Sequence, residues 1–193
     1  MKRSYLFLAE GFEEIEALTP VDVLRRANID IYTVAIGPDR AVKGAHGVTV
    51  MADMTFSEMR SLAGQADWLI LPGGMPGASN LAAFTPLNDL LMAHAADGGN
   101  IAAICASPGV VLGPLGLLDG KPATCYPGFE QYAPNALWQE QRVVAVPHLV
   151  TGNGPSSALP WALTILAADS SDAEAHEVGA GMLFYDKKSN FYF

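Results

Sequence analysis

Short apolar segments alternate along the chain with segments whose apolar residues recur at helical spacing. Apolar runs of about four to eight residues are typical of buried strands, and the helical spacing is typical of helices that cover a sheet. The predicted strands are 5–9, 29–36, 68–71, 101–104, 143–146 and 149–151, with a hairpin over 42–52. The predicted helices are 13–27, 57–66, 81–96, 108–115, 155–168 and 173–183. Strands separated by helices predict one α/β domain over 1–193, with a parallel sheet covered on both faces.

Three prolines fall inside or beside the predicted helices. Pro20 should bend or interrupt the first helix, because proline removes a backbone donor and clashes with the preceding turn. Pro86 should mark a start or a break. Pro108 fits the first turn of its helix, where a missing N–H costs little.

The composition narrows the class of protein. The chain has 193 residues, of which 50% are hydrophobic and 16% charged, enough for one buried core. A net charge of −9 disfavours nucleic acid and anionic membranes as partners. The apolar run over 5–9 is too short for a signal peptide, and no run approaches a membrane span. Two cysteines do not form a disulfide framework, so we expect a cytoplasmic protein.

Cys105 is the first candidate for chemistry, because it stands between a predicted strand and a predicted helix. Such a turn lifts a side chain above the carboxyl edge of the sheet, where open α/β folds place their sites. The small residues Ala103, Ala106 and Gly109 leave room for the turn. The helix N-terminus should lower the pKa of the thiol and favour thiolate. The alternative is a small buried hydrophobe, the commoner case for a lone cysteine in an apolar strand.

Two further segments bear on this choice. Pro72, Gly73 and Gly74 follow a buried strand, so their backbone N–H groups can face the same edge and hold an oxyanion. Glycine after a strand is also common in any α/β protein.

The first strand–helix junction carries a cluster of acidic residues, Glu10, Glu13, Glu14 and Glu16. A solvated helix start would explain these residues, since the helix dipole favours carboxylates there. Glu16, however, lies beside an apolar face, where a carboxyl is desolvated and holds its proton more readily.

Together these segments resemble the ThiJ/PfpI superfamily, in the branch of the Parkinson-disease-associated protein DJ-one and its bacterial relatives. The resemblance rests on AEGFEEIEALTPVDVLRRA, LPGGMPGASNL, AAICASPGVVL and GPSSALPWAL, at 9–27, 71–81, 102–112 and 154–163. It implies a flavodoxin-like three-layer α/β sandwich with a cysteine on a nucleophile elbow, and a homodimer.

The resemblance also implies roles for individual residues. Cys105 would be the nucleophile or sensor thiol, and Glu16 a protonated carboxyl hydrogen-bonded to it. Gly74 and Ala106 would supply backbone N–H groups to an oxyanion. The pocket would further include Gly73, Tyr126, Arg26, His46, Gly154 and Pro155. No cofactor and no metal are expected.

Two positions depart from the family pattern. Ala106 stands where the protease-like branches have histidine, so no Cys–His dyad is encoded beside the thiol. Tyr126 stands where the DJ-one branch usually has histidine, and a phenol is a poor proton shuttle near neutral pH.

The remaining candidates are weaker. His94, His148 and His176 have no metal-ligand spacing with cysteine or with each other. Cys125 is either a resolving thiol or a small buried residue, and the second is the commoner case.

Four hypotheses for the function follow. The first is a homodimeric thiol protein acting on a small-molecule aldehyde by glyoxalase or deglycase chemistry, or responding to peroxide. The second is a non-enzymatic redox sensor or chaperone controlled by oxidation of Cys105. An enzyme of thiazole or thiamine metabolism and a PfpI-type protease are the others.

Overall fold

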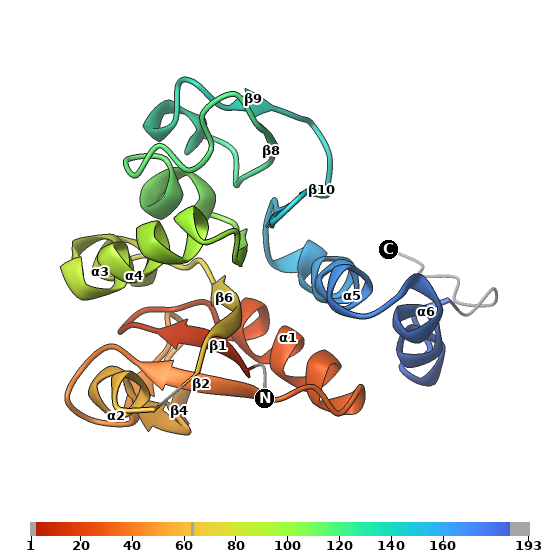
Figure 1. Ribbon diagram of the computed structural model, residues 1–193, viewed down its shortest axis with the longest axis horizontal. Helices are drawn as coiled ribbons and strands as arrows, with labels where there is room; N and C mark the ends of the chain where they lie inside the picture. The colour runs from red at the N-terminus through yellow and green to blue at the C-terminus, as the bar shows by residue number, and fades with distance from the viewer. Residues whose placement is uncertain (1–2, 63, 186–193) are drawn as a thin grey trace.

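A central seven-stranded sheet organises the molecule, and the computed structural model describes residues 3–62 and 64–185 (Figure 1). The strand order is β10-β11-β7-β6-β1-β2-β5, with every neighbouring pair parallel except β10 and β11. Its strands are β1 (Arg3–Leu8), β2 (Ile31–Ala35), β5 (Met54–Thr55), β6 (Ala66–Leu71), β7 (Asn100–Ile104), β10 (Val143–Val146) and β11 (Leu149–Gly152). Two small sheets pair β3 (Ala41–Lys43) with β4 (Thr49–Met51) and β8 (Pro122–Ala123) with β9 (Leu137–Trp138).

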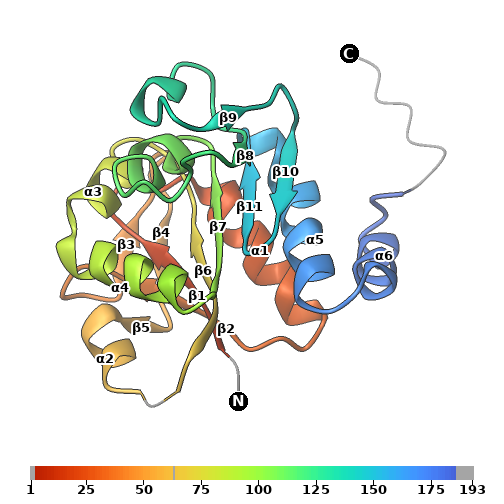
Figure 2. The same ribbon diagram turned by 45° about the horizontal axis from the view of Figure 1, so that its top comes forward.

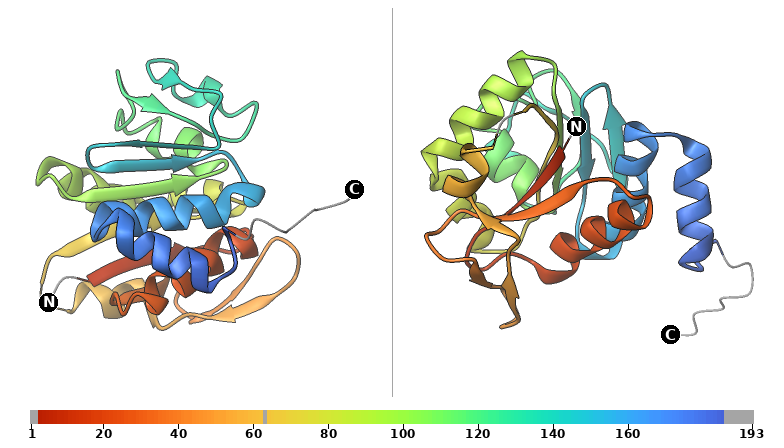
Figure 3. Two further views of the ribbon diagram at one scale, coloured as in Figure 1. Left: turned by 90° about the vertical axis from the view of Figure 1, so that its right-hand side faces the viewer. Right: turned by 60° about the horizontal axis from the view of Figure 1, so that its bottom comes forward.

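Helices cover both faces of this sheet, so the predicted three-layer α/β architecture is confirmed (Figures 2 and 3). The helices are α1 (Glu14–Arg26), α2 (Phe56–Arg60), α3 (Gly77–Ala83), α4 (Thr85–Ala96), α5 (Ala158–Asp169) and α6 (Asp172–Gly181). Helices α1 and α5 lie on one face, with α6 outside α5, and α2, α3 and α4 lie on the other. Among the described residues no helix is long and apolar enough to cross a membrane.

Two buried layers explain the continuous apolar run at the start of the chain. Leu6 and Leu8 of β1 pack toward α1 and α5, whereas Tyr5 and Phe7 pack toward α2 and α4. Successive side chains of a strand point to opposite faces, so a strand buried on both faces is a nearly continuous apolar run.

The sequence predicted the first three helices less well than the strands. Helix α1 runs through Pro20 without interruption, so of the predicted bend or interruption the second is wrong and the first stays a prediction. The ring is buried at the cost of one backbone hydrogen bond. The helix predicted over 57–66 ends at Arg60. Residues 1–2, 63 and 186–193 belong to the predicted domain but lie outside the described residues. The break predicted at Pro86 is confirmed, since α3 and α4 meet at Phe84.

The later elements also differ in detail. The segment after Cys105 forms a five-residue π-helical turn, Pro108–Leu112, in place of a helix reaching 115. A 3-10 turn, Pro155–Ser157, precedes α5, and another covers Glu130–Tyr132. The short strands β5, β8 and β9 were not predicted, because two residues carry no periodicity.

Candidate functional site

The carboxyl ends of four adjacent strands, β11, β7, β6 and β1, bring the candidate residues to one edge of the sheet (Figure 2). Cys105 directly follows β7, and Gly73 and Gly74 follow β6. Glu16 lies in the first turn of α1, which follows β1. Parallel strands end at the same edge, so residues far apart in sequence meet there.

Cys105 occupies a tight turn with a φ of 62°. Its backbone is fixed on both sides, since its N–H donates to Gly152 O at 2.9 Å and its carbonyl accepts from Tyr126 N–H at 2.8 Å. A non-glycine residue with positive φ is uncommon and persists only where the surroundings hold it. The side chain is 8% exposed, so a small molecule has restricted access to the sulfur.

Glu16 places a fully buried carboxyl against this thiol. Its Oε2 accepts a hydrogen bond of 2.8 Å from Gly73 N–H, while Oε1 is buried without a well-formed hydrogen bond. The Cys105 thiol is the hydrogen-bonding side chain that faces the carboxyl. A Cβ on Gly73 would lie 2.6 Å from Cys105 Cβ and 2.8 Å from Glu16 Oε2, so the contact requires glycine.

The two groups hold their protons as a pair. Burial, with a smaller effect of Glu13, raises the pKa of Glu16 to about 7. Burial and the Glu16 carboxylate raise the pKa of the Cys105 thiol to about 12. Groups in such close contact titrate together, so the pair loses one proton near neutrality and retains the other. That remaining proton lies either on sulfur or on the Glu16 oxygen, and in the second case Glu16 donates to a thiolate.

While Glu16 is ionised, the pKa of the Cys105 thiol is raised, contrary to the low value predicted from the helix N-terminus. The turn after Cys105 has five residues, and its N–H groups do not compensate for burial and for a neighbouring carboxylate. Thiolate requires transfer of the proton to Glu16.

Two backbone N–H groups reach the sulfur and oppose the rise in its pKa, those of Gly74 and Ala106. Gly74 has a φ of 86°, and a Cβ there would lie 2.4 Å from Glu13 N. These donors stabilise negative charge at the sulfur, and oxygen bound next to it would lie within their reach.

Tyr126 and Gly154 lie together on another side of Cys105. A Cβ on Gly154 would be 3.3 Å from Tyr126 Cδ2, and Pro155 begins the 3-10 turn that follows. The Tyr126 ring is 46% exposed and packs edge to face on Phe129, with 6.2 Å between centroids. The phenol ring is thus partly exposed and lies beside Gly154.

His46 comes from the β3–β4 hairpin and contacts the start of α1. Its Nδ1 lies 2.8 Å from Glu14 Oε2, and its backbone N–H donates to Glu14 Oε1 at 2.8 Å. The hydrogen bond to Glu14 raises the pKa of His46. Burial alone would raise the pKa of Glu14, but its hydrogen bonds, including the one from His46, outweigh burial and lower this pKa.

Glu13, Glu14 and His46 form a group that could hold a metal ion, with one ligand atom from each within 4.8 Å of the others. Both oxygens of Glu14 already accept hydrogen bonds, and the adjacent N-terminus of α1 repels a cation. The expectation that the protein holds no metal stays a prediction.

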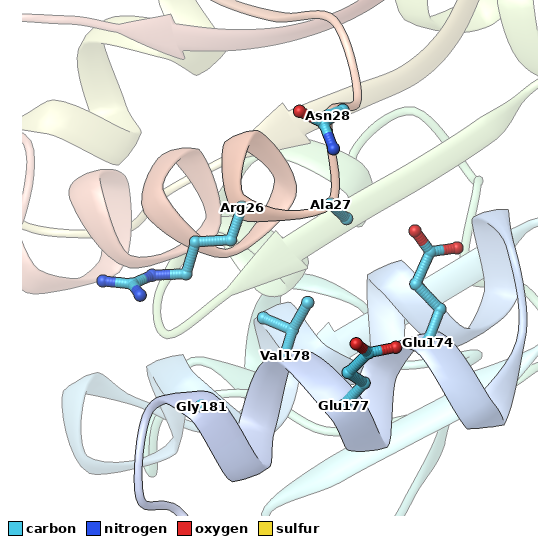
Figure 4. A pocket seen from close by; sticks show the side chains of 7 residues that line it. All are labelled: Arg26, Ala27, Asn28, Glu174, Glu177, Val178 and Gly181. Carbon is cyan, nitrogen blue, oxygen red and sulfur yellow. The ribbon is translucent and has the colours of Figure 1, made fainter.

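Arg26 lies at the far end of α1 from Glu16, about 15 Å along the helix axis. It forms a 2.9 Å ion pair with Asp22 and lines a cavity of about 500 Å³ with Glu174 and Glu177 of α6 (Figure 4). Within one chain Arg26 does not reach the thiol, contrary to the pocket predicted from the resemblance.

Glu13 is the residue that the sequence did not assign to the site. A solvated helix start would leave its carboxylate exposed, whereas the structure buries it. The spacing from Glu13 to Glu16 could have shown this, because an N-cap side chain accepts from the backbone N–H three residues on.

The fold and the site define a class: flavodoxin-like α/β proteins with a cysteine on a strained turn and a buried glutamate against it. The chain belongs to the DJ-1/PfpI family, which it matches over residues 2–168. It is 32% identical to the Arabidopsis thaliana protein named Protein DJ-1 homolog B, over 99% of this chain and 43% of that protein, so it spans less than half of that relative.

For two further relatives, the match covers most of the relative's own length. The Caenorhabditis elegans protein named Glutathione-independent glyoxalase DJR-1.2 is 30% identical over 81% of this chain and 82% of that protein. The solved structure of oxidized Toxoplasma gondii DJ-1 has a TM-score of 0.90 and 36% identity, covering 95% of this chain and 98% of that one.

Proposed function

We propose that this DJ-1 family protein acts on small reactive carbonyl compounds through Cys105, by glyoxalase- or deglycase-type chemistry. The observation that carries the proposal is the buried Glu16–Cys105 pair, which keeps one proton at neutral pH beside two backbone N–H donors. The C. elegans relative named a glyoxalase supports the same chemistry.

In the first step the proton of the pair lies on Glu16 and the Cys105 thiolate attacks the aldehyde carbon. A carbon–sulfur bond forms and the carbonyl π electrons move to oxygen, which the N–H groups of Gly74 and Ala106 can stabilise. Glu16 then gives its proton to that oxygen, and a neutral hemithioacetal results.

With a 2-oxoaldehyde, Glu16 as carboxylate next takes the proton from the carbon bonded to sulfur. It returns this proton to the neighbouring carbon, while the hydroxyl proton on the sulfur-bonded carbon moves to the oxygen of that neighbouring carbon. The carbonyl re-forms at the sulfur-bonded carbon, and the product is a thioester of a 2-hydroxy acid. Water hydrolyses the thioester and restores the thiol. The sum is one aldehyde plus one water giving one 2-hydroxy acid.

The charges around the pair favour an uncharged substrate. The Glu13 carboxylate adds negative charge beside Glu16 and raises its pKa. This supports a neutral aldehyde over the phosphate-bearing substrates expected of thiazole metabolism. Ala106 follows Cys105 where the protease-like branches have histidine, which counts against a Cys–His protease.

The experiment is an assay of the purified protein with methylglyoxal, following lactate. We expect turnover by wild type and by Cys125→Ser, which removes the other buried thiol, and none by Cys105→Ser. Equal lactate production by Cys105→Ser would overturn the proposal.

A non-enzymatic redox sensor is the second candidate. The same N–H groups and a protonated Glu16 could hold the oxygens of a Cys105 sulfinate, and one close structural relative was solved in an oxidized form. Intact-mass analysis after graded peroxide separates the two: a stoichiometric gain of two oxygens at Cys105 without methylglyoxal turnover would favour the sensor.

A homodimer is also part of the proposal. Four large apolar side chains, Ile15, Leu18, Val48 and Met51, are exposed by 41% to 70%, and they lie on α1 and on the hairpin that contacts it. A patch of this kind beside a site is typical of an interface. Two free cysteines fit a reducing compartment, so we propose the cytoplasm.

A further inference from the structure

Three hydrogen bonds link Glu13, Glu16 and Gly73 in a closed ring. Glu13 Oε2 accepts from Glu16 N–H at 2.7 Å, and Glu13 N–H donates to Gly73 O at 3.0 Å. Gly73 N–H closes the ring by donating to Glu16 Oε2 at 2.8 Å. The ring joins the N-terminus of α1 to the turn after β6, and it holds the Glu16 carboxyl in place.

Glu13 also brings a second carboxylate next to Glu16. It is 6% exposed, and His46 Nδ1 lies 4.0 Å from Glu13 Oε1 and 2.8 Å from Glu14 Oε2. His46 is therefore shared with Glu14. The titratable groups that face Glu16 are Glu13 on its own helix and Cys105 after β7.

We propose that Glu13 is a positioning residue for the reaction, which orients Glu16 through the ring and, by its negative charge, keeps the shared proton on Glu16 rather than on Cys105. The role follows from two effects of one side chain. The hydrogen bonds fix where the Glu16 carboxyl lies. The charge disfavours ionised Glu16 more than it disfavours the Cys105 thiolate, because the Glu13 carboxylate is hydrogen-bonded to the Glu16 backbone N–H and raises the pKa of Glu16. Thiolate is then available while Glu16 keeps the proton.

The inference rests on the proposed role of the Glu16–Cys105 pair, but its test requires no turnover. The test is the pH dependence of Cys105 alkylation by iodoacetamide, measured by intact mass in a Cys125→Ser background. With Glu13 in place, the rate should rise with a midpoint near 7, where the pair loses its first proton.

Glu13→Gln keeps an oxygen that can accept from Glu16 N–H but removes the charge. We expect the midpoint to fall by about 1 pH unit, because a like charge in contact raises a carboxyl pKa by about that much or more. We also expect the rate above the midpoint to fall by about threefold to tenfold, since the proton returns to sulfur. Glu13→Ser, a neutral residue that caps helices well, provides a second neutral variant with the same expected shift.

Two controls separate charge from structure. Glu13→Asp keeps both the charge and the cap, and it should restore the wild-type midpoint. Glu14→Gln removes a buried carboxylate that faces His46 and should leave the midpoint unchanged. An unchanged midpoint in both neutral variants, or an equal shift in Glu13→Asp, would overturn the proposal. Loss of methylglyoxal turnover with the expected alkylation shifts would instead count against the proposed function alone.

Discussion

The backbone N–H of Gly73 donates a 2.8 Å hydrogen bond to Glu16 Oε2, although the two residues are 57 positions apart in the chain. The contact exists because β1 and β6 are adjacent parallel strands, and the segments that follow them leave the sheet at the same edge. Gly73 also approaches Cys105 so closely that a side chain has no room there. One glycine thus sets the distance between the thiol and its acid.

Replacing this glycine should damage the site. In Gly73→Ala the new Cβ would lie 2.6 Å from Cys105 Cβ, so the backbone must move and the hydrogen bond to Glu16 must lengthen. We expect methylglyoxal turnover to fall by about 100-fold, since small misplacements of reacting groups have effects of that size. We also expect the free energy of unfolding to fall by about 1–3 kcal/mol from overpacking.

Gly37→Ala is the matched control, because a Cβ at Gly37 meets no atom within 4 Å. It should change neither quantity appreciably. Equal losses in both variants would show that glycine replacement, and not the site contact, is responsible.

Glu16 should make the protein less stable as the pH rises toward neutrality. Its pKa in the folded protein is about 7, above the ordinary value of 4.5, so its contribution is full below 4.5 and is lost as the pH rises through 7. The loss is up to about 3 kcal/mol for a shift of this size.

Urea unfolding of wild type and Glu16→Gln at several pH values between about 4.5 and 8 measures this effect. His46, whose pKa is also raised, contributes in the same direction to both proteins, so the difference between them isolates Glu16. Parallel pH profiles for the two proteins would contradict the raised pKa.

Tyr126 should limit the rate of carbonyl turnover. Its partly exposed ring lies beside Gly154, at a position where the family branch usually has histidine, and a phenol is a weak proton shuttle at neutral pH. We expect Tyr126→His to raise kcat with methylglyoxal by about tenfold or more, and Glu16→Gln to abolish most activity in both backgrounds. If wild type is already fast and Tyr126→His is slower, the natural substrate needs the phenol as a hydrogen-bond donor.

The exposed apolar surface on α1 should hold two chains together. Light scattering at micromolar concentration should give twice the chain mass of 20.4 kDa for wild type. Ile15→Glu places a charge where the side chain is 57% exposed, and it should give the single-chain mass with the fold intact by circular dichroism. A wild-type protein that is monomeric at this concentration would contradict the dimer, and with it any role for Arg26 at a neighbouring site.

The sequence predicted the sheet and the site to different extents. Strands buried on both faces, such as β1 and β7, leave continuous apolar runs that are easy to recognise. The turn at Cys105 was predictable because small residues surround a thiol between two apolar segments. The thiol pKa was not, because it depends on the depth of burial and on Glu16, which only the folded chain brings together.

The burial of Glu13 and the distance of Arg26 from the thiol both depend on the folded chain, so the sequence does not predict them. Burial of Glu13 depends on its backbone hydrogen bond to Gly73 O, a contact between distant segments. Arg26 was placed by resemblance, whereas the length of α1 puts it at the opposite end of the helix from Glu16.

The central claim is that Cys105 and Glu16 share one proton at neutral pH and that thiolate forms when Glu16 holds it. Thiolate absorbance near 240 nm, titrated in Cys125→Ser and in Cys125→Ser with Glu16→Gln, tests this most directly. The account predicts a rise in absorbance centred near pH 7 when Glu16 is present, and its disappearance in the glutamine variant. The same titration curve in both proteins, or no thiolate below about pH 9 in either, would contradict it.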